Sequence, residues 1–406
     1  MPDRFDDTGF LLRSLMDNIS DKIYFKDRES RFVMLNKTCM KWHGFTSEKD
    51  YAGKTDFDVF TKEHAQQAFD DEQRIIATGE PLLGVEERET WEDGTVTWVS
   101  TTKMPLRDKN GQIIGTFGIS RDITEQKEAQ LKASQYAAEI MRINEAMEDD
   151  VRMAGELQKT FFPKSYPDFP EGAEAASLLI EFHHHYFAGG ILGGDYCAVT
   201  KLSEHEAGVF LCDVMGHGVR AALGTAFVRA MVEEISAIEN DPGRFLTHMN
   251  RVLLPILQQE DVLLFTTACY LVVDVADGSV RAASAGHPLP MYFSGADGSV
   301  RWLFEDRSWC GPALALCEGE DYPTIQIEML PGDAIVMFTD GLFEVAGANR
   351  DELGEQRLLE IARRHARLAL PNRFTAILDD ARQFSSKGTF EDDVCLIGFR
   401  LKATMP

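Results

Sequence analysis

The stretch that decides the interpretation of this chain is Asp213-Val214-Met215-Gly216-His217-Gly218, in which an aspartate and two glycines follow the apolar run Gly208 to Cys212. Three further aspartates stand at the ends of expected strands: Asp195 in Gly193-Gly194-Asp195-Tyr196, Asp340 in Phe338-Thr339-Asp340-Gly341, and Asp392 in Glu391-Asp392-Asp393-Val394. A carboxylate beside a buried strand is costly unless something neutralises it. Several converging carboxylates therefore predict a shared divalent cation.

Oxygen ligands alone favour Mg²⁺ or Mn²⁺ over zinc. A pair of such ions can bind phosphate and lower the pKa of a bridging water, which prepares hydroxide for in-line attack on phosphorus. A single Asp-Gly pair is usually only a turn. Four such aspartates, together with the small-residue loop Gly216-His217-Gly218, favour a metal site instead.

The segment around these motifs, residues 166–402, reads as α/β with antiparallel pairing. Asp277-Gly278 and Asp297-Gly298 are typical hairpin turns. Expected strands are Ser177–His183, Gly208–Cys212, Ala268–Val275, Ser279–Ala285, Ala334–Phe338 and Val394–Leu401; expected helices are Val219–Ile238, Arg244–Gln259, Gln356–Arg367 and Phe374–Gln383. The pattern predicts two packed sheets with helices outside.

The N-terminal segment, residues 8–124, predicts a smaller α+β sensor domain. A hairpin is expected across Asp27-Arg28-Glu29-Ser30, and three strands, 83–90, 95–105 and 113–120, are separated by Asp93-Gly94 and Asn110-Gly111. Helical patches lie between these two groups of strands, at 37–43 and 64–77.

Residues 125–165 predict a helical linker rich in good helix formers. Apolar residues recur every seven positions, in the series Ala133, Ile140, Met147, Ala154, Phe161 and in the series Tyr136, Ile143, Leu157, where Asp150 interrupts the second one. About four heptads predict a parallel dimeric coiled coil. The alternative is a single amphipathic helix packed on the C-terminal domain.

The composition restricts partners and location. The net charge is −25 and the pI about 4.8, which argues against nucleic acid and against anionic membranes. The seven cysteines include no Cys-x-x-Cys pair, and no signal peptide or membrane-length apolar run is visible, so we expect reduced thiols and a cytoplasmic protein.

Residues 150–402 resemble the PPM-type metal-dependent phosphatases of the bacterial SpoIIE/RsbU-like branch. The resemblance rests on the four aspartate motifs and on Ser284-Ala285-Gly286-His287-Pro288. It implies an α-β-β-α sandwich and a protein serine/threonine phosphatase that holds two Mn²⁺ or Mg²⁺ ions. The implied metal ligands are Asp195, Asp213, the Val214 carbonyl, Asp340 and Asp392, with Asp213 and Asp195 as the catalytic residues and Asp393 as a weaker candidate for a ligand. His217 and His287 belong to family motifs without an assigned role.

The same resemblance implies a substrate, a phosphorylated STAS-type anti-sigma-factor antagonist. The N-terminal segment resembles a PAS domain, through Ser20 to Asp27, Gly53 to Asp58 and Asp122-Ile123-Thr124. This implies a mixed sheet around a small pocket, a sensing role and a homodimer formed through the linker and the PAS domain. The PAS ligand stays unidentified: Cys39 lacks a flavin-adduct motif, and His43 or His64 would be an unusual haem ligand.

Three other functions are alternatives to a phosphatase. A sensor histidine kinase needs a phospho-accepting histidine on the linker, and no histidine lies between His64 and His183. A diguanylate cyclase signature begins with Gly-Gly-Asp, but here Tyr196 and Cys197 follow. A non-enzymatic scaffold would not need the four aspartates.

Overall fold

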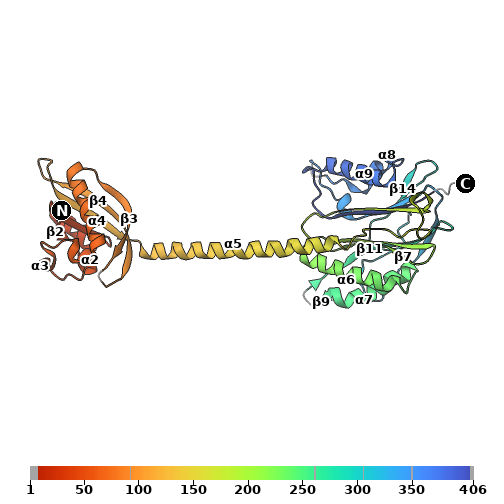
Figure 1. The fold of residues 1–406 in the computed structure, drawn as a ribbon, viewed down its shortest axis with the longest axis horizontal. Helices are drawn as coiled ribbons and strands as arrows, with labels where there is room; N and C mark the ends of the chain where they lie inside the picture. Colours follow the sequence, from red (N-terminus) through yellow and green to blue (C-terminus); the bar gives the residue numbers. More distant parts are fainter. Residues whose placement is uncertain (1–7, 92, 260–261, 305, 349–350, 403–406) are drawn as a thin grey trace, which may run out of the picture. The chain divides into compact units, whose positions relative to one another are not determined.

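The structure, a computed structural model, describes residues 8–402 except 92, 260–261, 305 and 349–350. The chain divides into two compact units, Met1–Asn144 and Glu145–Pro406, and each is described by itself (Figure 1). The division falls inside the long helix α5, Thr124–Lys159. The domain boundaries expected from the sequence therefore stay a prediction.

The N-terminal unit is built on one five-stranded sheet in the order β2-β1-β5-β4-β3. Every neighbouring pair of strands is antiparallel, and β5 lies between β1 and β4 and runs opposite to both. The sheet is therefore antiparallel throughout, and not mixed as the resemblance implied. The strands are β1 Lys22–Asp27, β2 Phe32–Leu35, β3 Leu82–Thr90, β4 Val96–Arg107 and β5 Ile113–Asp122, and the helices are α1 Thr8–Asn18, α2 Lys37–Trp42, α3 Glu48–Tyr51, η1 Asp56–Asp58 and α4 Lys62–Thr78.

Side chains in the predicted turns close these hairpins. Asp27 Oδ1 accepts hydrogen bonds from the N–H groups of Glu29 and Arg31 in the β1–β2 turn. Asp108 Oδ1 does the same in the β4–β5 turn, where Gly111 adopts a φ of 82°. Asp side chains favour turns for this reason, and glycine tolerates the left-handed backbone.

In the single chain, the predicted heptad seam of helix α5 is exposed to solvent. Tyr136, Ile140 and Met147 are each at least 59% exposed. The helix ends at Lys159, so Phe161, the last predicted seam position, lies beyond it and packs under the guanidinium of Arg229. The seam therefore ends at Leu157.

The C-terminal unit contains two antiparallel-rich sheets. One has the order β15-β12-β11-β8-β7 with β16 beside β12, and the other has the order β14-β13-β17-β18-β6. The strands are β6 Ile180–Phe187, β7 Asp195–Lys201, β8 Glu206–Val214, β11 Thr266–Asp274, β12 Ser279–Ala285, β13 Met291–Phe293, β14 Val300–Trp302, β15 Cys310–Gly311, β16 Ile325–Glu328, β17 Ala334–Phe338 and β18 Val394–Leu401. Strands β9 Gln258–Gln259 and β10 Val262–Leu263 form a separate two-stranded antiparallel sheet. Single 3₁₀ turns lie at η2 Ala175–Ser177 and η3 Asp340–Leu342.

Two helix pairs cover the outer faces of the two sheets, α6 Val219–Ser236 with α7 Pro242–Leu257 and α8 Gly354–Arg364 with α9 Leu370–Phe384 (Figure 1). One buried cluster, which includes Leu211, Leu271 and Ile397, fills the space between the sheets. Two others join each sheet to its own helix pair. The unit thus has four layers, α-β-β-α, as predicted.

The N-terminal strand of this sandwich begins later than expected. Ser177 belongs to η2, and β6 starts at Ile180 and continues through the three histidines to Phe187. His184 bonds the Tyr166 hydroxyl on one face, and His183 lies against Phe374 on the other. The three consecutive histidines, His183 to His185, therefore alternate between the two faces of β6, and all three are half-buried. In the described chain, no helix is both apolar and long enough to span a bilayer.

Candidate active site

The predicted aspartates meet where the two sheets end together. Asp195 is the first residue of β7, and it pairs directly with Asp213 near the end of β8. Asp340 follows β17 and opens η3, whereas Asp392 comes two residues before β18. Because β17 and β18 are neighbours in the second sheet, the site receives two carboxylates from each sheet.

Glycines allow the backbone to close around these carboxylates. A β-carbon on Gly194 would lie 2.3 Å from the Val214 carbonyl oxygen and 3.0 Å from Asp213 Oδ1. A β-carbon on Gly193 would lie 2.2 Å from Asp393 Oδ2. Real β-carbons do not approach so closely, so the glycines of the Gly-Gly-Asp motif are required by packing against the carboxylates.

Asp393 has a structural position distinct from that of Asp392. Its Oδ1 accepts a hydrogen bond from Gly189 N (2.9 Å) and its Oδ2 one from Gly194 N (2.6 Å). Both oxygens of Asp393 are therefore engaged with the loop that precedes β7. Asp392 makes no such loop contacts among the described residues; its Oδ1 accepts only from the neighbouring Asp393 N–H.

Thr339 was not singled out from the sequence, although it stands beside Asp340 in the quoted motif. Its hydroxyl donates to Asp195 Oδ2 at 2.8 Å and accepts from the Cys395 N–H at 2.9 Å. Thr339 thereby fixes the orientation of Asp195 from the opposite sheet. The signal that could have revealed it is a hydroxyl residue at the end of an otherwise apolar strand.

The carboxylates raise one another's pKa. Burial, and next the charges of Asp340 and Asp392, raise the pKa of Asp213 to about 7. Burial, followed by the charge of Asp213, raises the pKa of Asp195 well above its usual value. Glu344, which the sequence analysis did not assign, also has a raised pKa because of burial and the charge of Asp340. Like charges held together in this way are unfavourable without a counter-ion.

The residues present fit the two divalent ions that the sequence implied. No lysine or arginine in the described chain pairs with Asp195, Asp213, Asp340 or Asp392. Their charges are therefore left for a cation to neutralise, and all the side-chain donors are oxygen. Within the described residues, however, no three acidic, histidine or cysteine side chains already converge as around a bound ion.

A pocket of about 180 Å³ adjoins this cluster, and Gly341, Glu344, Thr389 and Asp392 are among its lining residues.

The two histidines of the motifs differ in their exposure to solvent. His217 is exposed in the loop after β8. His287 is buried, its Nδ1 lies 2.9 Å from the Thr267 hydroxyl, and burial lowers its pKa to about 3, so it remains neutral.

Helix α5 is bonded directly to the loop that carries Asp195. Gln158 Nε2 donates to the Gly193 carbonyl oxygen at 2.6 Å, and Gln158 Oε1 accepts from Gly193 N at 3.0 Å. One turn earlier, Gly155 packs so closely that a β-carbon would lie 2.6 Å from the Ile191 carbonyl oxygen. The face of α5 that follows the heptad seam by one residue, at Gly155 and Gln158, therefore fixes this loop, which the heptad pattern alone did not indicate.

The fold and the acidic site together define a PP2C-type domain preceded by a PAS-type sheet. A solved structure described as the SiaA-PP2C domain of Pseudomonas aeruginosa superposes with a TM-score of 0.54 at 21% identity, covering 64% of this chain and 99% of that one. This likeness concerns the fold alone. A cyclase interpretation of the Gly-Gly-Asp motif does not agree with this fold.

Residues 203–402 match the family model described as Stage II sporulation protein E (SpoIIE), and residues 16–128 match the PAS fold. These segments are thus a SpoIIE-family domain and a PAS-fold domain. Two relatives from Bacillus subtilis are named phosphoserine phosphatases: RsbU, 25% identical over 207 residues (51% of this chain), and RsbP, 24% identical over 166 residues (41% of this chain). The matches span 57% and 40% of the lengths of these relatives.

Proposed function

We propose that this chain is a metal-dependent protein serine/threonine phosphatase whose activity is set by its PAS domain through helix α5. The observation that carries the proposal is the group of carboxylates at the end of the sandwich, which no lysine or arginine among the described residues pairs with. The names of the RsbU and RsbP relatives support the same activity.

Each residue would have a distinct part. Asp213 would be a ligand of both Mn²⁺ or Mg²⁺ ions, and the Val214 carbonyl would be a ligand of one; Asp340 and Asp392 would hold the second ion, and Asp195 would support the first. Bound ions supply positive charge for a phosphate group and lower the pKa of coordinated water. Thr339 holds Asp195 in place through its hydrogen bond to Oδ2.

The substrate we propose is phosphoserine or phosphothreonine on a STAS-type anti-sigma-factor antagonist, as the family resemblance implies. We further propose a cytoplasmic homodimer. The exposed seam of α5 supports it, and so do exposed apolar residues on the outer face of the PAS sheet, Met34 and Ile119. A coiled coil would cover the first surface, and contact between two PAS sheets would cover the second.

The direct test is turnover of a phosphoserine peptide by the full chain with Mn²⁺, with Mg²⁺ and with EDTA. Asp213→Asn should lower kcat/KM by about two to three decades, the usual loss when an electrostatic group is removed from a site. It should also weaken Mn²⁺ binding measured by calorimetry. Asp277→Asn is the matched control, because its hairpin lies at the far end of the sheet from Asp213.

Full turnover in EDTA would refute the metal mechanism. Metal binding without turnover of any phosphopeptide or phosphorylated STAS protein would favour the scaffold, and turnover of GTP would favour the cyclase.

A further inference from the structure

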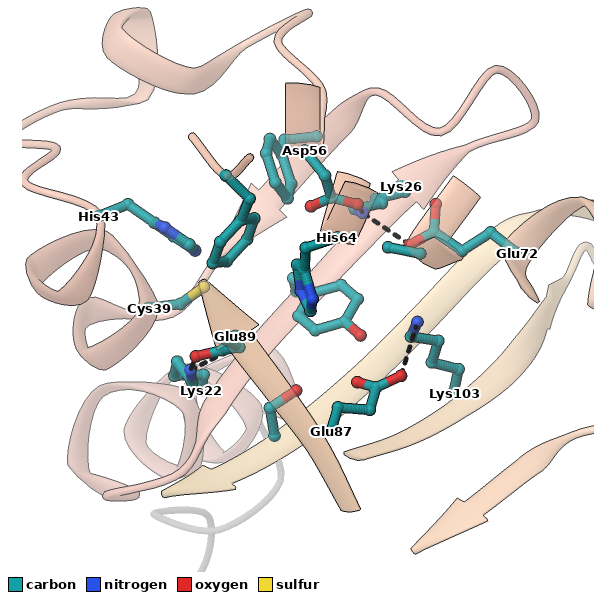
Figure 2. A pocket seen from close by; sticks show the side chains of 15 residues that line it. Lys22, Lys26, Cys39, His43, Asp56, His64, Glu72, Glu87, Glu89 and Lys103 are labelled. Carbon is teal, nitrogen blue, oxygen red and sulfur yellow. Dashed lines mark hydrogen bonds and ion pairs between the residues drawn. The ribbon is translucent and has the colours of Figure 1, made fainter. Parts of the chain in front are cut away.

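The inner face of the PAS sheet is charged. With α4 and η1 it encloses a cavity of about 30 Å³ (Figure 2). Three lysines line it, Lys22, Lys26 and Lys103, and four carboxylates face them, Asp56, Glu72, Glu87 and Glu89. These seven side chains, which we name the charged cage, come from five different elements. Aromatic rings, including Tyr24 and Phe60, complete the walls.

Burial of so many charges is not explained by stability. The side chains of Lys22, Lys26 and Lys103 are only 5%, 2% and 4% exposed. Removing charges from water costs several kcal/mol per ion, and replacing buried ion pairs by apolar residues is often neutral or stabilising. A sensor-sized domain could form a more stable core without them, so the charged cage indicates a function.

The pairing inside the charged cage is uneven. Lys22 Nζ donates to both oxygens of Glu89, at 2.9 and 2.8 Å, and Lys26 Nζ donates to Asp56 and, at 2.6 Å, to Glu72 Oε1. Among the described residues, in contrast, Lys103 Nζ contacts carboxylates only at 3.4 Å (Glu87) and 3.8 Å (Asp71).

Glu72 has the complementary defect. Its Oε2 has no hydrogen-bond partner in the part of the chain that the structure describes, and the residue is 0% exposed. An unpaired buried carboxylate oxygen is among the most unfavourable polar groups in a protein interior. Figure 2 shows the Lys103 ammonium directed into the space between Glu72 and Glu87. One free acceptor and one weakly bonded donor therefore face the same cavity.

The size and charge of the cavity restrict what could bind there. One water needs about 10–15 Å³ of such space, so the cavity as it stands has room for about two. It cannot hold a haem or flavin ring, although His43, His64 and Cys39 line it. His43 and His64 are neutral because burial lowers their pKa, whereas burial raises the pKa of the Glu72 carboxyl. Three lysines thus face four carboxyl groups, and the two sets are close to balanced in charge. A ligand with a net charge would meet strong opposition from one set or the other.

We propose that the charged cage binds a small molecule without net charge that donates a hydrogen bond to Glu72 Oε2 and accepts one from Lys103 Nζ. The weak pairing of Lys103 lets its side chain move aside for a molecule of several heavy atoms. Two kinds of compound share this chemistry: a zwitterionic amino acid, and a neutral amide or hydroxyketone. This proposal does not depend on the phosphatase activity.

The test is calorimetric titration of the full chain with two sets of compounds. Glycine, alanine and serine represent the zwitterions; acetamide, 2-pyrrolidinone and 3-hydroxybutan-2-one represent the neutral donor–acceptor molecules. Acetate and methylammonium are the singly charged controls. We expect one of the two sets to contain a compound that binds once per chain, and the set to which it belongs identifies the source.

Variants then locate the site. Glu72→Gln and Lys103→Met should each weaken this binding at least about tenfold. With its oxygen held by Lys26, the glutamine turns an NH₂ donor toward the donor of the ligand, and methionine removes the ammonium donor. The matched controls are Glu86→Gln and Lys127→Met, which alter a more exposed ion pair and should leave the affinity within about twofold. Circular dichroism checks folding, and if Glu72→Gln does not fold, Lys103→Met still tests the site.

Three outcomes would overturn the proposal. The first is that acetate or methylammonium binds as tightly as any uncharged compound. The second is that both folded cage variants keep the parent affinity. The third is that no compound of either set binds with a Kd below about 1 mM, a weak affinity that corresponds to only about 4 kcal/mol.

Discussion

Replacing Gln158 with alanine should separate helix α5 from the active-site loop while leaving the metal ligands intact. The side chain is 4% exposed and makes two hydrogen bonds to Gly193, two residues before Asp195. Truncation leaves the Gly193 N–H and carbonyl without these partners. At about 1–3 kcal/mol for each of the two buried groups left unpaired, the loop conformation should lose about 2–6 kcal/mol.

That loss of loop stability can be measured as a fall in catalytic efficiency. If it falls on the active conformation, kcat/KM for a phosphoserine peptide should drop by about 30- to 20,000-fold, because 1.4 kcal/mol corresponds to a factor of ten. The fall should be partly reversed by high Mn²⁺, since metal binding favours the ordered loop. Gln135→Ala, an exposed glutamine on the same helix, is the control for helix propensity.

A Gln158→Ala chain that is folded, dimeric to the same extent as the parent, and fully active would refute this reasoning. In that case the two hydrogen bonds would be a passive attachment, and regulation through α5 would need a different contact.

Three other predictions concern separate parts of the molecule. Gly194→Ala should abolish phosphatase activity, because the new methyl group would meet the Val214 carbonyl oxygen, whereas Gly190→Ala, which has no neighbour closer than 3.7 Å, should be tolerated; a phosphopeptide assay with a thermal unfolding control distinguishes them. Asp150→Leu should tighten the proposed dimer in analytical ultracentrifugation and make activity independent of the PAS domain, because it removes a like-charge pair from the core of the proposed coiled coil; unchanged affinity and regulation would make the linker a passive tether. Thiol alkylation should spare activity, since Cys317 is the exposed one among the seven cysteines and the proposed chemistry uses none of them; trapping a phosphocysteine would contradict this.

Much of the catalytic domain could be predicted from local sequence. Asp-Gly turns mark hairpins because few residues tolerate a positive φ, and Gly278 and Gly298 both adopt one, at 78° and 77°. The helices and most of the longer strands followed from apolar periodicity. The start of β6 was misplaced because Ser177 to Leu179 resemble strand in composition, but the chain first makes the 3₁₀ turn η2.

The candidate site was only partly predictable. Motif spacing identified the aspartates, yet the different positions of Asp392 and Asp393 depend on which carboxylate accepts the N–H groups of Gly189 and Gly194, some 200 residues away. The same holds for Thr339 and Gln158, whose partners lie on segments distant in sequence. Long-range hydrogen bonds leave no periodic trace in a sequence.

The PAS sheet shows most clearly what the sequence determined and what it left to the tertiary structure. The alternation in Lys22-Ile23-Tyr24-Phe25-Lys26 determined that the lysines share one face of β1 and the apolar residues the other. Hydrophobicity would place the lysines outside, yet Lys22 and Lys26 are 4% and 2% exposed. Period-two alternation defines two faces but not which face turns inward. That choice was made by Asp56, Glu72 and Glu89, which arrive from other elements and supply the opposite charges that make burial of an ammonium group possible.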